Sequence, residues 1–338
     1  MSEIITLQDD AFHYKYYQDR EKAFWYTEWW YFNFYDPIKN YKGMITYAVF
    51  NPGNIFPTGV ASLNCAIFDS NDRSIDTDIE YFPLWDFSAS YEKPDVKITS
   101  HNSLYAVDKN YMHVKGRTRN HSVEIDLFYT QDDTPVFLAK DTVSTELPWE
   151  ISSWLVYMPS AKVEGVIKTK DENIQIQGIG YHDHDWGIWY EFMETWKWAH
   201  FSIPSKNIAF VVGLQAAFQK SPGYFRYGDV TFRFYENDYK VEFGAYETWE
   251  VLYSYPTEIS FELTTTGSDG KEYRLLLHWS VLLTSVLWRY PVIVFEQTAA
   301  FKGQLYQKKD TNWELVETID TQGFCESTST WYSPLEKS

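Results

Sequence analysis

The sequence is poor in cysteine and in basic residues. Its 338 residues include only two cysteines, Cys65 and Cys325, which are too few for a disulfide framework, so we expect a reduced compartment. Lysine and arginine total 29 against 47 acidic residues, a formal net charge of −18. Such a surface repels polyanions, so neither nucleic acid nor an anionic membrane is an expected partner.

Membrane and secretion signals are also missing from the pattern. The N-terminal stretch MSEIITLQDD has neither the basic region nor the apolar run of a signal peptide. The longest apolar run, in Trp279–Trp288, is interrupted by Ser and Thr and is shorter than the ~18 apolar residues of a membrane span. We therefore expect a cytoplasmic protein without stable membrane insertion, whose oligomeric state the sequence leaves open.

Aromatic residues, in contrast, are abundant, at 19% of the chain. They favour strands, and they line pockets for large apolar ligands. Short segments of alternating polarity, such as Ile45–Phe50, Val123–Tyr129 and Ile208–Leu214, recur along the chain with turn residues between them. Because no long helical period and no Gly-rich phosphate loop accompany them, the pattern predicts an all-β barrel or sandwich.

The chain contains an internal repeat, in which WWYFNFYDP aligns with WKWAHFSIP. The matched pairs, each 167 residues apart, are Trp29 and Trp196, Phe34 and Phe201, and Pro37 and Pro204. A repeat this long indicates duplicated domains rather than a solenoid. We predict an N-terminal domain over residues 1–165 and a C-terminal domain over residues 166–338.

Side-chain alternation assigns two faces to these Trp-rich strands. In the first copy one face carries Glu28, Trp30, Phe32 and Phe34, and the other carries Trp29, Tyr31 and Asn33. In the second copy Trp196, Trp198 and His200 occupy the face equivalent to Trp29, Tyr31 and Asn33. One strand from each half could therefore wall a shared aromatic pocket at or near the domain interface.

The most concentrated polar motif is GYHDHDWG, from Gly180 to Gly187. On a strand, its two histidines, His182 and His184, point one way, and Tyr181, Asp183 and Asp185 point the other. Four ionisable side chains in a row are costly to bury unless they are paired. The motif therefore predicts a metal site, an acid–base site or a buried polar network.

A metal site would use His182 and His184, because His-x-His on a strand is a good start for zinc. Glu194 or His200 could supply a third ligand. No cysteine lies close to the motif, and the chain has no His-Glu-x-x-His pattern. We expect no metal and no organic cofactor.

An acid–base site would use a carboxyl group of Asp183, Asp185 or Glu28, since burial can raise the pKa of such a group until it holds a proton at neutral pH. Aromatic faces nearby would then stabilise a developing carbocation. The remaining interpretation is a buried hydrogen-bond network that only holds the two halves together. The other histidines carry no carboxylate neighbour in a motif and are interpreted as ordinary surface or core residues: His13, His101, His113, His121 and His278.

Four sequence blocks resemble one known family. They are EWWY (Glu28–Tyr31), PSAKVEGVI (Pro159–Ile167), GIGYHDHDWG (Gly178–Gly187) and WKWAH (Trp196–His200). In order and spacing these blocks, over roughly residues 25 to 305, resemble the AttH-like and carotenoid 1,2-hydratase (hydroxyneurosporene synthase) superfamily, to which tocopherol cyclase and the lipocalin-like Diels–Alderases are similar. The resemblance implies two tandem lipocalin-like (calycin) β-barrel domains that act on hydrophobic, unsaturated substrates.

From the residues and the resemblance together we expect a cofactor-independent cyclase or isomerase acting on a polyene or isoprenoid natural product. Ring closure could begin by protonation, or it could be pericyclic and use a shaped pocket with one or two hydrogen bonds from Tyr181 or His184. The alternatives are a hydratase that adds water to a C=C bond, a non-catalytic lipocalin-like carrier and, third, a metal-dependent hydrolase.

The residues expected to form the site fall into two groups. The expected catalytic residues are Asp183, Asp185, His182, His184 and Glu28. The expected substrate-binding residues are Trp30, Tyr31, Tyr181, Trp186, Trp196, Trp198 and His200.

Overall fold

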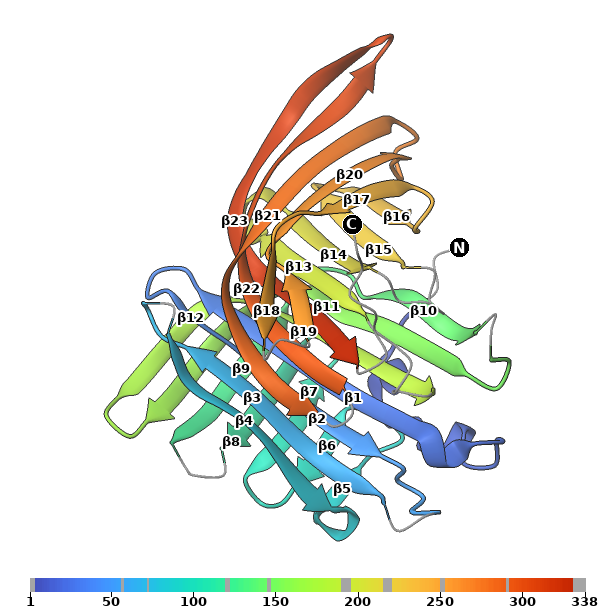
Figure 1. The fold of residues 1–338 in the computed structure, drawn as a ribbon, viewed down its shortest axis with the longest axis vertical. Coiled ribbons are helices and arrows are strands. Elements are labelled where there is room, and N and C mark those ends of the chain that lie inside the picture. The colour runs from blue at the N-terminus through green and yellow to red at the C-terminus, as the bar shows by residue number, and fades with distance from the viewer. Residues whose placement is uncertain are drawn as a thin grey trace. The chain divides into compact units, whose positions relative to one another are not determined.

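The computed structural model describes residues 4–55, 58–71, 73–118, 122–144, 147–189, 196–214, 221–249, 253–289 and 292–330. The chain divides into two compact units, Met1–Tyr190 and Glu191–Ser338 (Figure 1). Helical structure in the described ranges consists of short 3₁₀ turns: η1 (Leu7–Asp10), η2 (Tyr14–Tyr16), η3 (Ala23–Trp25), η4 (Leu84–Asp86) and η5 (Pro204–Lys206).

The first unit contains one antiparallel sheet, which curls into a nearly closed barrel. Its strands are β1 (Tyr26–Asp36), β2 (Tyr41–Phe50), β3 (Val60–Phe68), β4 (Ser74–Pro83), β5 (Phe87–Ala89), β6 (Asp95–Ile98), β7 (Asn102–Asp108), β8 (Tyr111–Arg117), β9 (Val123–Gln131), β10 (Val136–Val143), β11 (Ile151–Thr169) and β12 (Asn173–Ile188). In the described residues they pair in the order β4-β3-β2-β1-β12-β11-β9-β8-β7-β6-β5, with β10 paired to β11.

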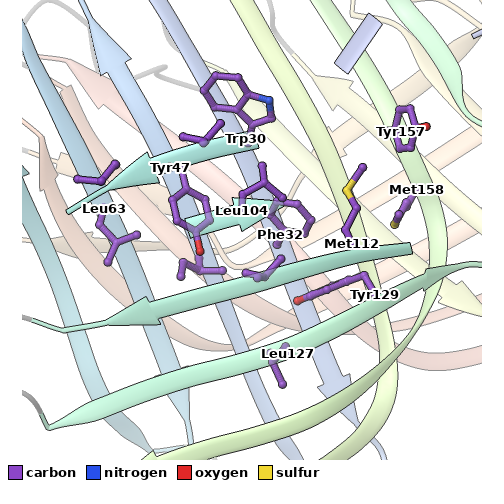
Figure 2. Close-up of a cluster of buried hydrophobic side chains, with 14 of the residues drawn as sticks. Trp30, Phe32, Tyr47, Leu63, Leu104, Met112, Leu127, Tyr129, Tyr157 and Met158 are labelled. Carbon is purple, nitrogen blue, oxygen red and sulfur yellow. The ribbon is translucent and has the colours of Figure 1, made fainter. Parts of the chain in front are cut away.

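The barrel interior is filled by large side chains from opposite walls. Trp30 and Phe32 of β1 lie near Tyr47 of β2, and Met112 and Leu127 reach in from β8 and β9 (Figure 2). All five are at most 1% exposed. Every second residue of a strand supplies such a side chain, as the period of the sequence predicts.

The second unit contains a longer-stranded antiparallel sheet and a small hairpin. The strands are β13 (Lys197–Ile203), β14 (Ile208–Leu214), β15 (Gly223–Tyr227), β16 (Val230–Phe234), β17 (Tyr239–Phe243), β18 (Tyr246–Trp249), β19 (Tyr253–Pro256), β20 (Glu258–Thr266), β21 (Glu272–Arg289), β22 (Val292–Lys309) and β23 (Asn312–Thr330). Within the described residues the sheet order is β16-β15-β14-β13-β23-β22-β21-β20-β17, and β18 pairs with β19. Its own apolar cluster includes Phe201, Phe210 and Phe301.

The two units repeat one strand order. The run β4-β3-β2-β1-β12-β11 in the first unit corresponds to β16-β15-β14-β13-β23-β22 in the second. The strands β1 and β13, which come first along the chain in each unit, hold corresponding places in the two runs and contain most of the aligned Trp-rich segments. The predicted all-β fold of two barrel-type domains is confirmed, while the predicted pocket at their interface stays a prediction.

The division between the units differs from the predicted boundary. Residue 165 lies inside β11, which pairs along its length with β12 of the same sheet. The barrel needs both strands, because β12 joins β11 to β1. The compact units accordingly divide after Tyr190. In the described part of the chain, no helix has the length and apolar character that crossing a membrane requires.

Candidate functional site

The motif GYHDHDWG lies in β12, between β1 and β11. Directly opposed residues of an antiparallel pair share a face. His182 is opposite Phe32 and His184 is opposite Trp30, so both histidines point into the barrel of the first unit. The predicted division of the motif between two faces is confirmed, with Tyr181, Asp183 and Asp185 on the other face.

The glycine that ends the motif allows β11 to approach β12 closely. Gly187 has φ +156°, and a Cβ at this position would lie 2.0 Å from the carbonyl oxygen of Ile151. Any larger residue would push the two strands apart. The last Gly of the motif thus keeps the preceding Trp186 and the histidines in register.

A buried chain of carboxylates and imidazoles lies inside the barrel. Glu28 of β1 and His184 are both 0% exposed, and His184 Nε2 lies 2.8 Å from Glu28 Oε1. The other ring nitrogen, Nδ1, lies 3.1 Å from Oδ1 of Asp10, close enough for an ion pair although not aligned as a hydrogen bond. An ionised carboxylate only accepts hydrogen bonds, so a neutral ring would turn a lone pair toward one of the two anions. The geometry therefore favours a doubly protonated His184.

Asp10, at the end of η1, also contacts the second histidine of the motif. His182 Nε2 lies 3.0 Å from Asp10 Oδ2, and His182 Nδ1 lies 2.9 Å from the carbonyl oxygen of Tyr31. The His182 ring stacks on Phe32, with ring centroids 3.9 Å apart and planes at 4°. Trp30 Nε1 donates a hydrogen bond of 3.0 Å to the Asp10 carbonyl oxygen, which fixes this N-terminal segment to the barrel wall.

His13 extends the chain on the other side of Glu28. Its backbone N–H donates to both Glu28 carboxylate oxygens, at 3.0 and 3.1 Å, and its Nδ1 lies 3.2 Å from Glu28 Oε1. The hydroxyl of Tyr26 donates to Glu28 Oε2. The sequence predicted His13 to be an ordinary surface or core residue because no carboxylate lies in its motif. Its carboxylate partner is distant in sequence and becomes a neighbour only through folding.

The pKa values of this network separate proton donors from acceptors. Burial alone would raise the pKa of Asp10 and of Glu28, but their bonds and charge interactions with the histidines outweigh burial and hold both pKa values below the usual range. Burial lowers the pKa of His184, but Asp10 and Glu28 together outweigh it and raise that pKa. For His13 burial dominates, and Glu28 offsets it only in part, so its pKa is lowered. The direction for Glu28 is opposite to the one that an acid role requires.

A cavity of about 370 Å³ is lined by His13, the last residue of this buried network, and by Trp186. The His13 and Trp186 rings stack with centroids 3.9 Å apart and planes at 3°. His13 is 9% exposed, and within the described residues its Nε2 has no hydrogen-bond partner. Because Nδ1 faces an ionised carboxylate, Nδ1 carries the proton and Nε2 presents a lone pair. The cavity wall thus carries a neutral imidazole base backed by a carboxylate.

The opposite face of β12 carries the two predicted acids. Asp183 Oδ2 accepts hydrogen bonds from Trp154 Nε1, at 2.9 Å, and from the Tyr181 hydroxyl, at 2.7 Å. Asp185 is opposite Trp29 and is partly exposed. Tyr31 is opposite Asp183 on β1. The strand separates these residues from the histidine chain, so the structure divides the predicted catalytic residues into two groups.

Three predicted substrate-binding residues belong to the second unit. Trp198 and His200 share one face of β13, with ring centroids 6.1 Å apart. Trp196 precedes β13, and its backbone N–H donates to Thr328 Oγ1 at 2.7 Å. Their predicted contact with substrate stays a prediction.

Of the ligands considered for a metal site, His182 and His184 both contact Asp10, His200 belongs to the second unit, and Glu194 lies outside the described residues. Ligand atoms of His13, Glu28 and His184 do lie within 4.8 Å of one another, a donor set that suits zinc. Their separations of 2.8 and 3.2 Å match N–H···O hydrogen bonds, so we interpret the group as a hydrogen-bonded network.

The residues that the sequence analysis missed come mainly from the N-terminal segment. Asp10, His13 and Tyr17 lie in DDAFHYKYY, which mixes ionisable and aromatic residues as GYHDHDWG does. That composition was the available signal. Asp141, which also lines the cavity, has no comparable signal, because it follows an ordinary strand pattern.

No protein-family model matches the chain, and no curated protein matches its sequence. Solved structures do match. A putative AttH from Nitrosomonas europaea has a TM-score of 0.68 and 16% identity, with 96% of each chain covered. Kievitone hydratase from Nectria haematococca has a TM-score of 0.61 and 14% identity, with 95% of this chain and 94% of that chain covered. The chain therefore has the AttH-like fold, which confirms at the level of the fold the resemblance that its motifs predict.

Proposed function

We propose that the protein is a cofactor-independent enzyme that moves protons on an unsaturated small molecule, closing a ring or shifting a bond to give an isomer. The observation that carries this proposal is the fully buried chain of Asp10, His184 and Glu28, which ends at His13 on a cavity wall. Buried ionisable groups are expensive, and a carrier has little use for them. Perturbed pKa values beside a cavity are typical of catalytic sites.

In this mechanism His13 Nε2 removes a proton from the substrate. The Nδ1–H bond to Glu28 orients the ring and stabilises the imidazolium that forms, as a carboxylate does for a catalytic histidine. The same nitrogen then returns the proton to another substrate atom, so the product has the mass of the substrate. Protonated His184 and Tyr26 keep Glu28 ionised throughout, which prevents Glu28 from taking the proton itself.

The aromatic wall supports this chemistry. Trp186 stacks on His13 and lines the cavity with Phe137. Their π faces bind a planar or polyene substrate, and the Trp186 ring stabilises the positive charge of the His13 imidazolium that forms. In this proposal the proton-transfer role that was predicted for Glu28 belongs to His13, which acts as a base and is oriented by Glu28. Asp183 and Asp185, on the opposite face of β12, remain candidates for a separate acid.

Hydration is the second candidate. The likeness in fold to kievitone hydratase supports it, as does a cavity mouth that carries the exposed polar residues Asp141 and Lys140. His13 would then remove a proton from a water molecule as the water oxygen adds to one carbon of the double bond, and return that proton to the other carbon. The product would be heavier by one water.

The test is to incubate the protein in D₂O with a lipophilic extract of its source and to follow the products by mass spectrometry. An isomer carrying deuterium on carbon supports proton transfer, and a gain of one water supports hydration. An isomer without deuterium indicates pericyclic closure if His13→Gln still forms it, and internal return of the substrate's own proton if His13→Gln does not. A bound, unchanged compound would support the carrier and contradict the proposal.

Three variants locate the chemistry. His13→Gln should abolish conversion, while His101→Gln, at an exposed turn, should leave it unchanged. Asp183→Asn tests the opposite face of β12. If Asp183→Asn abolishes conversion and His13→Gln does not, the proposed site is on the wrong face.

A further inference from the structure

A second polar group faces the cavity across from His13. Asp141, in β10, lies where the pairing of β10 with β11 shifts register, between Ala139 and Thr142. Asp141 has φ +45°, and its backbone N–H donates to Ser153 Oγ at 2.9 Å. Bulges of this kind redirect a side chain out of the regular ladder, often next to a binding site. Here the bulge places Asp141 in the cavity lining.

Tyr17 holds the Asp141 carboxylate in place. The Tyr17 hydroxyl donates to Asp141 Oδ1 at 2.6 Å and accepts a hydrogen bond of 3.2 Å from Trp186 Nε1. Because Trp186 can only donate, the single hydroxyl proton of Tyr17 is committed to Asp141. Trp186 in turn stacks on His13. One continuous set of contacts therefore joins Asp141 to His13 along the cavity wall.

The two groups at the ends of this series of contacts, Asp141 and His13, both accept hydrogen bonds. His13 Nε2 presents a lone pair, and the second oxygen of Asp141 has neither a hydrogen-bond partner nor an ion pair within the described residues. The same cavity is lined by the aromatic rings of Trp186 and Phe137. A hydrocarbon in this cavity would displace water from both acceptors without replacing its hydrogen bonds.

We propose that the cavity binds a hydroxylated aromatic compound, with one hydroxyl group donating to Asp141 and another donating to His13. The flat ring lies against Trp186 and Phe137. Arg20 and Lys140, which also line the cavity, favour the phenolate that forms when His13 removes the proton. The proposal rests on the proposed function in naming the substrate class of the same cavity, and it disfavours a pure hydrocarbon polyene as substrate.

Three probes with one skeleton test this preference: resveratrol, its trimethyl ether and trans-stilbene. Their dissociation constants are measured by equilibrium dialysis at pH 7. Resveratrol should bind about 10-fold or more tightly than either of the others, because hydrogen bonds to charged groups have effects of that size. Equal affinity for the three probes, or no binding of resveratrol, would overturn the proposal.

Variants then assign the preference to Asp141. Asp141→Asn should weaken resveratrol binding about 10-fold and leave trans-stilbene unchanged. Tyr17→Phe keeps the aromatic ring but removes the hydrogen bond to the Asp141 carboxylate. It should weaken resveratrol binding less than Asp141→Asn does. Asp171→Asn, in an exposed turn away from the cavity, is the matched control. A full retention of resveratrol affinity in Asp141→Asn would contradict the assignment.

The two proposals can fail separately. Selective binding of resveratrol by a protein that converts no compound would leave the cavity assignment standing and remove the enzymatic function. Conversion of a hydrocarbon polyene that depends on His13 but not on Asp141 would leave the function standing and remove the assignment.

Discussion

The two units share a strand order but differ in what they place inside. In the first unit the interior positions of β12 are His182 and His184, opposite Phe32 and Trp30. In the second, the matching positions of β23 are Cys325 and Ser327, opposite Ala199 and Lys197. Cys325 and Ser327 lie near Gln297, at 3.7 and 3.4 Å. One framework thus carries two histidines at these β12 positions in one copy, and a cysteine and a serine at the matching β23 positions in the other.

This difference shows that the fold does not require the network. A sheet of the same order in the second unit packs on an apolar cluster that includes Phe201, Phe301 and Ala199, with Cys325 and Ser327 where the first unit has the two histidines. Fold and function are separable, because function depends on side chains that a common backbone can carry or omit. The ionisable network in the first unit therefore needs a reason other than folding.

The largest effect is expected when the network loses a charge. Glu28→Gln leaves protonated His184 and the buried Asp10 with incomplete pairing, and should lower the free energy of unfolding by about 3–5 kcal/mol. Urea denaturation followed by tryptophan fluorescence measures it. In the second unit, Cys325→Ala changes a buried side chain of β23, the counterpart of β12. It should lower the free energy of unfolding by about 1 kcal/mol. Equal losses would mean that the two interiors are energetically alike.

A change at the cavity end of the chain should separate activity from stability. His13→Gln keeps the backbone N–H bonds to Glu28 but removes the base, so turnover should fall by about 10²–10⁴-fold while stability changes by less than about 1 kcal/mol. The rate is measured on whichever compound the wild-type protein converts. A stability loss as large as that of Glu28→Gln would make His13 a structural residue.

The free energy of unfolding should depend on pH through the buried ionisable groups of the first unit. The raised pKa of His184 stabilises fully below its unfolded value of 6.5, and this contribution is lost as pH rises through the folded pKa. The lowered pKa values of Asp10 and Glu28 stabilise above their unfolded values of 3.8 and 4.5, and this contribution is lost as pH falls through the folded pKa values.

His13 adds to the loss of stability on the acid side, opposite in direction to the contribution of His184. Its lowered pKa stabilises above 6.5, and this contribution is lost as pH falls through the folded pKa. Unfolding curves at several pH values should show that Glu28→Gln flattens the alkaline decline, since His184 loses one of its carboxylates. Cys325→Ala should leave the shape unchanged. An alkaline decline that persists in Glu28→Gln would contradict the role of His184.

The smallest effect concerns the orientation of Tyr17. Trp186→Phe removes the Nε1–H bond to the Tyr17 hydroxyl while keeping an aromatic ring against His13. Loss of one hydrogen bond of this kind should cost about 1 kcal/mol in transition-state or ligand binding, or roughly 5-fold. The same substitution in the second unit, Trp198→Phe, measures whether Trp198, a predicted substrate-binding residue, contributes to activity or ligand binding.

Several features of the site could be predicted because they are periodic. Alternation in EWWYF placed Glu28 and Trp30 on one face, and alternation in GYHDHDWG placed His182 and His184 together, as the strand registers confirm. Neither pattern reveals which residues oppose each other across a barrel. Asp10, His13 and Asp141 reach Glu28, His184 or the cavity from separations of 15 residues or more, which depend on the closure of the whole sheet.

The sign of the Glu28 pKa shift is the clearest case of this limit. From sequence, a lone carboxylate among aromatic residues is either paired with a distant Arg or His, or functional with a pKa that burial raises. In the structure His13 and His184 each contact the same carboxylate and reverse the direction. The alternation of polarity, the repeat and the turn residues are local, so the sequence by itself determined the strands, their faces and the doubled barrel fold. Which ionisable groups meet, and therefore which of them holds a proton, was decided only by the tertiary structure, because charge interactions depend on distances of a few ångströms between segments far apart in the chain.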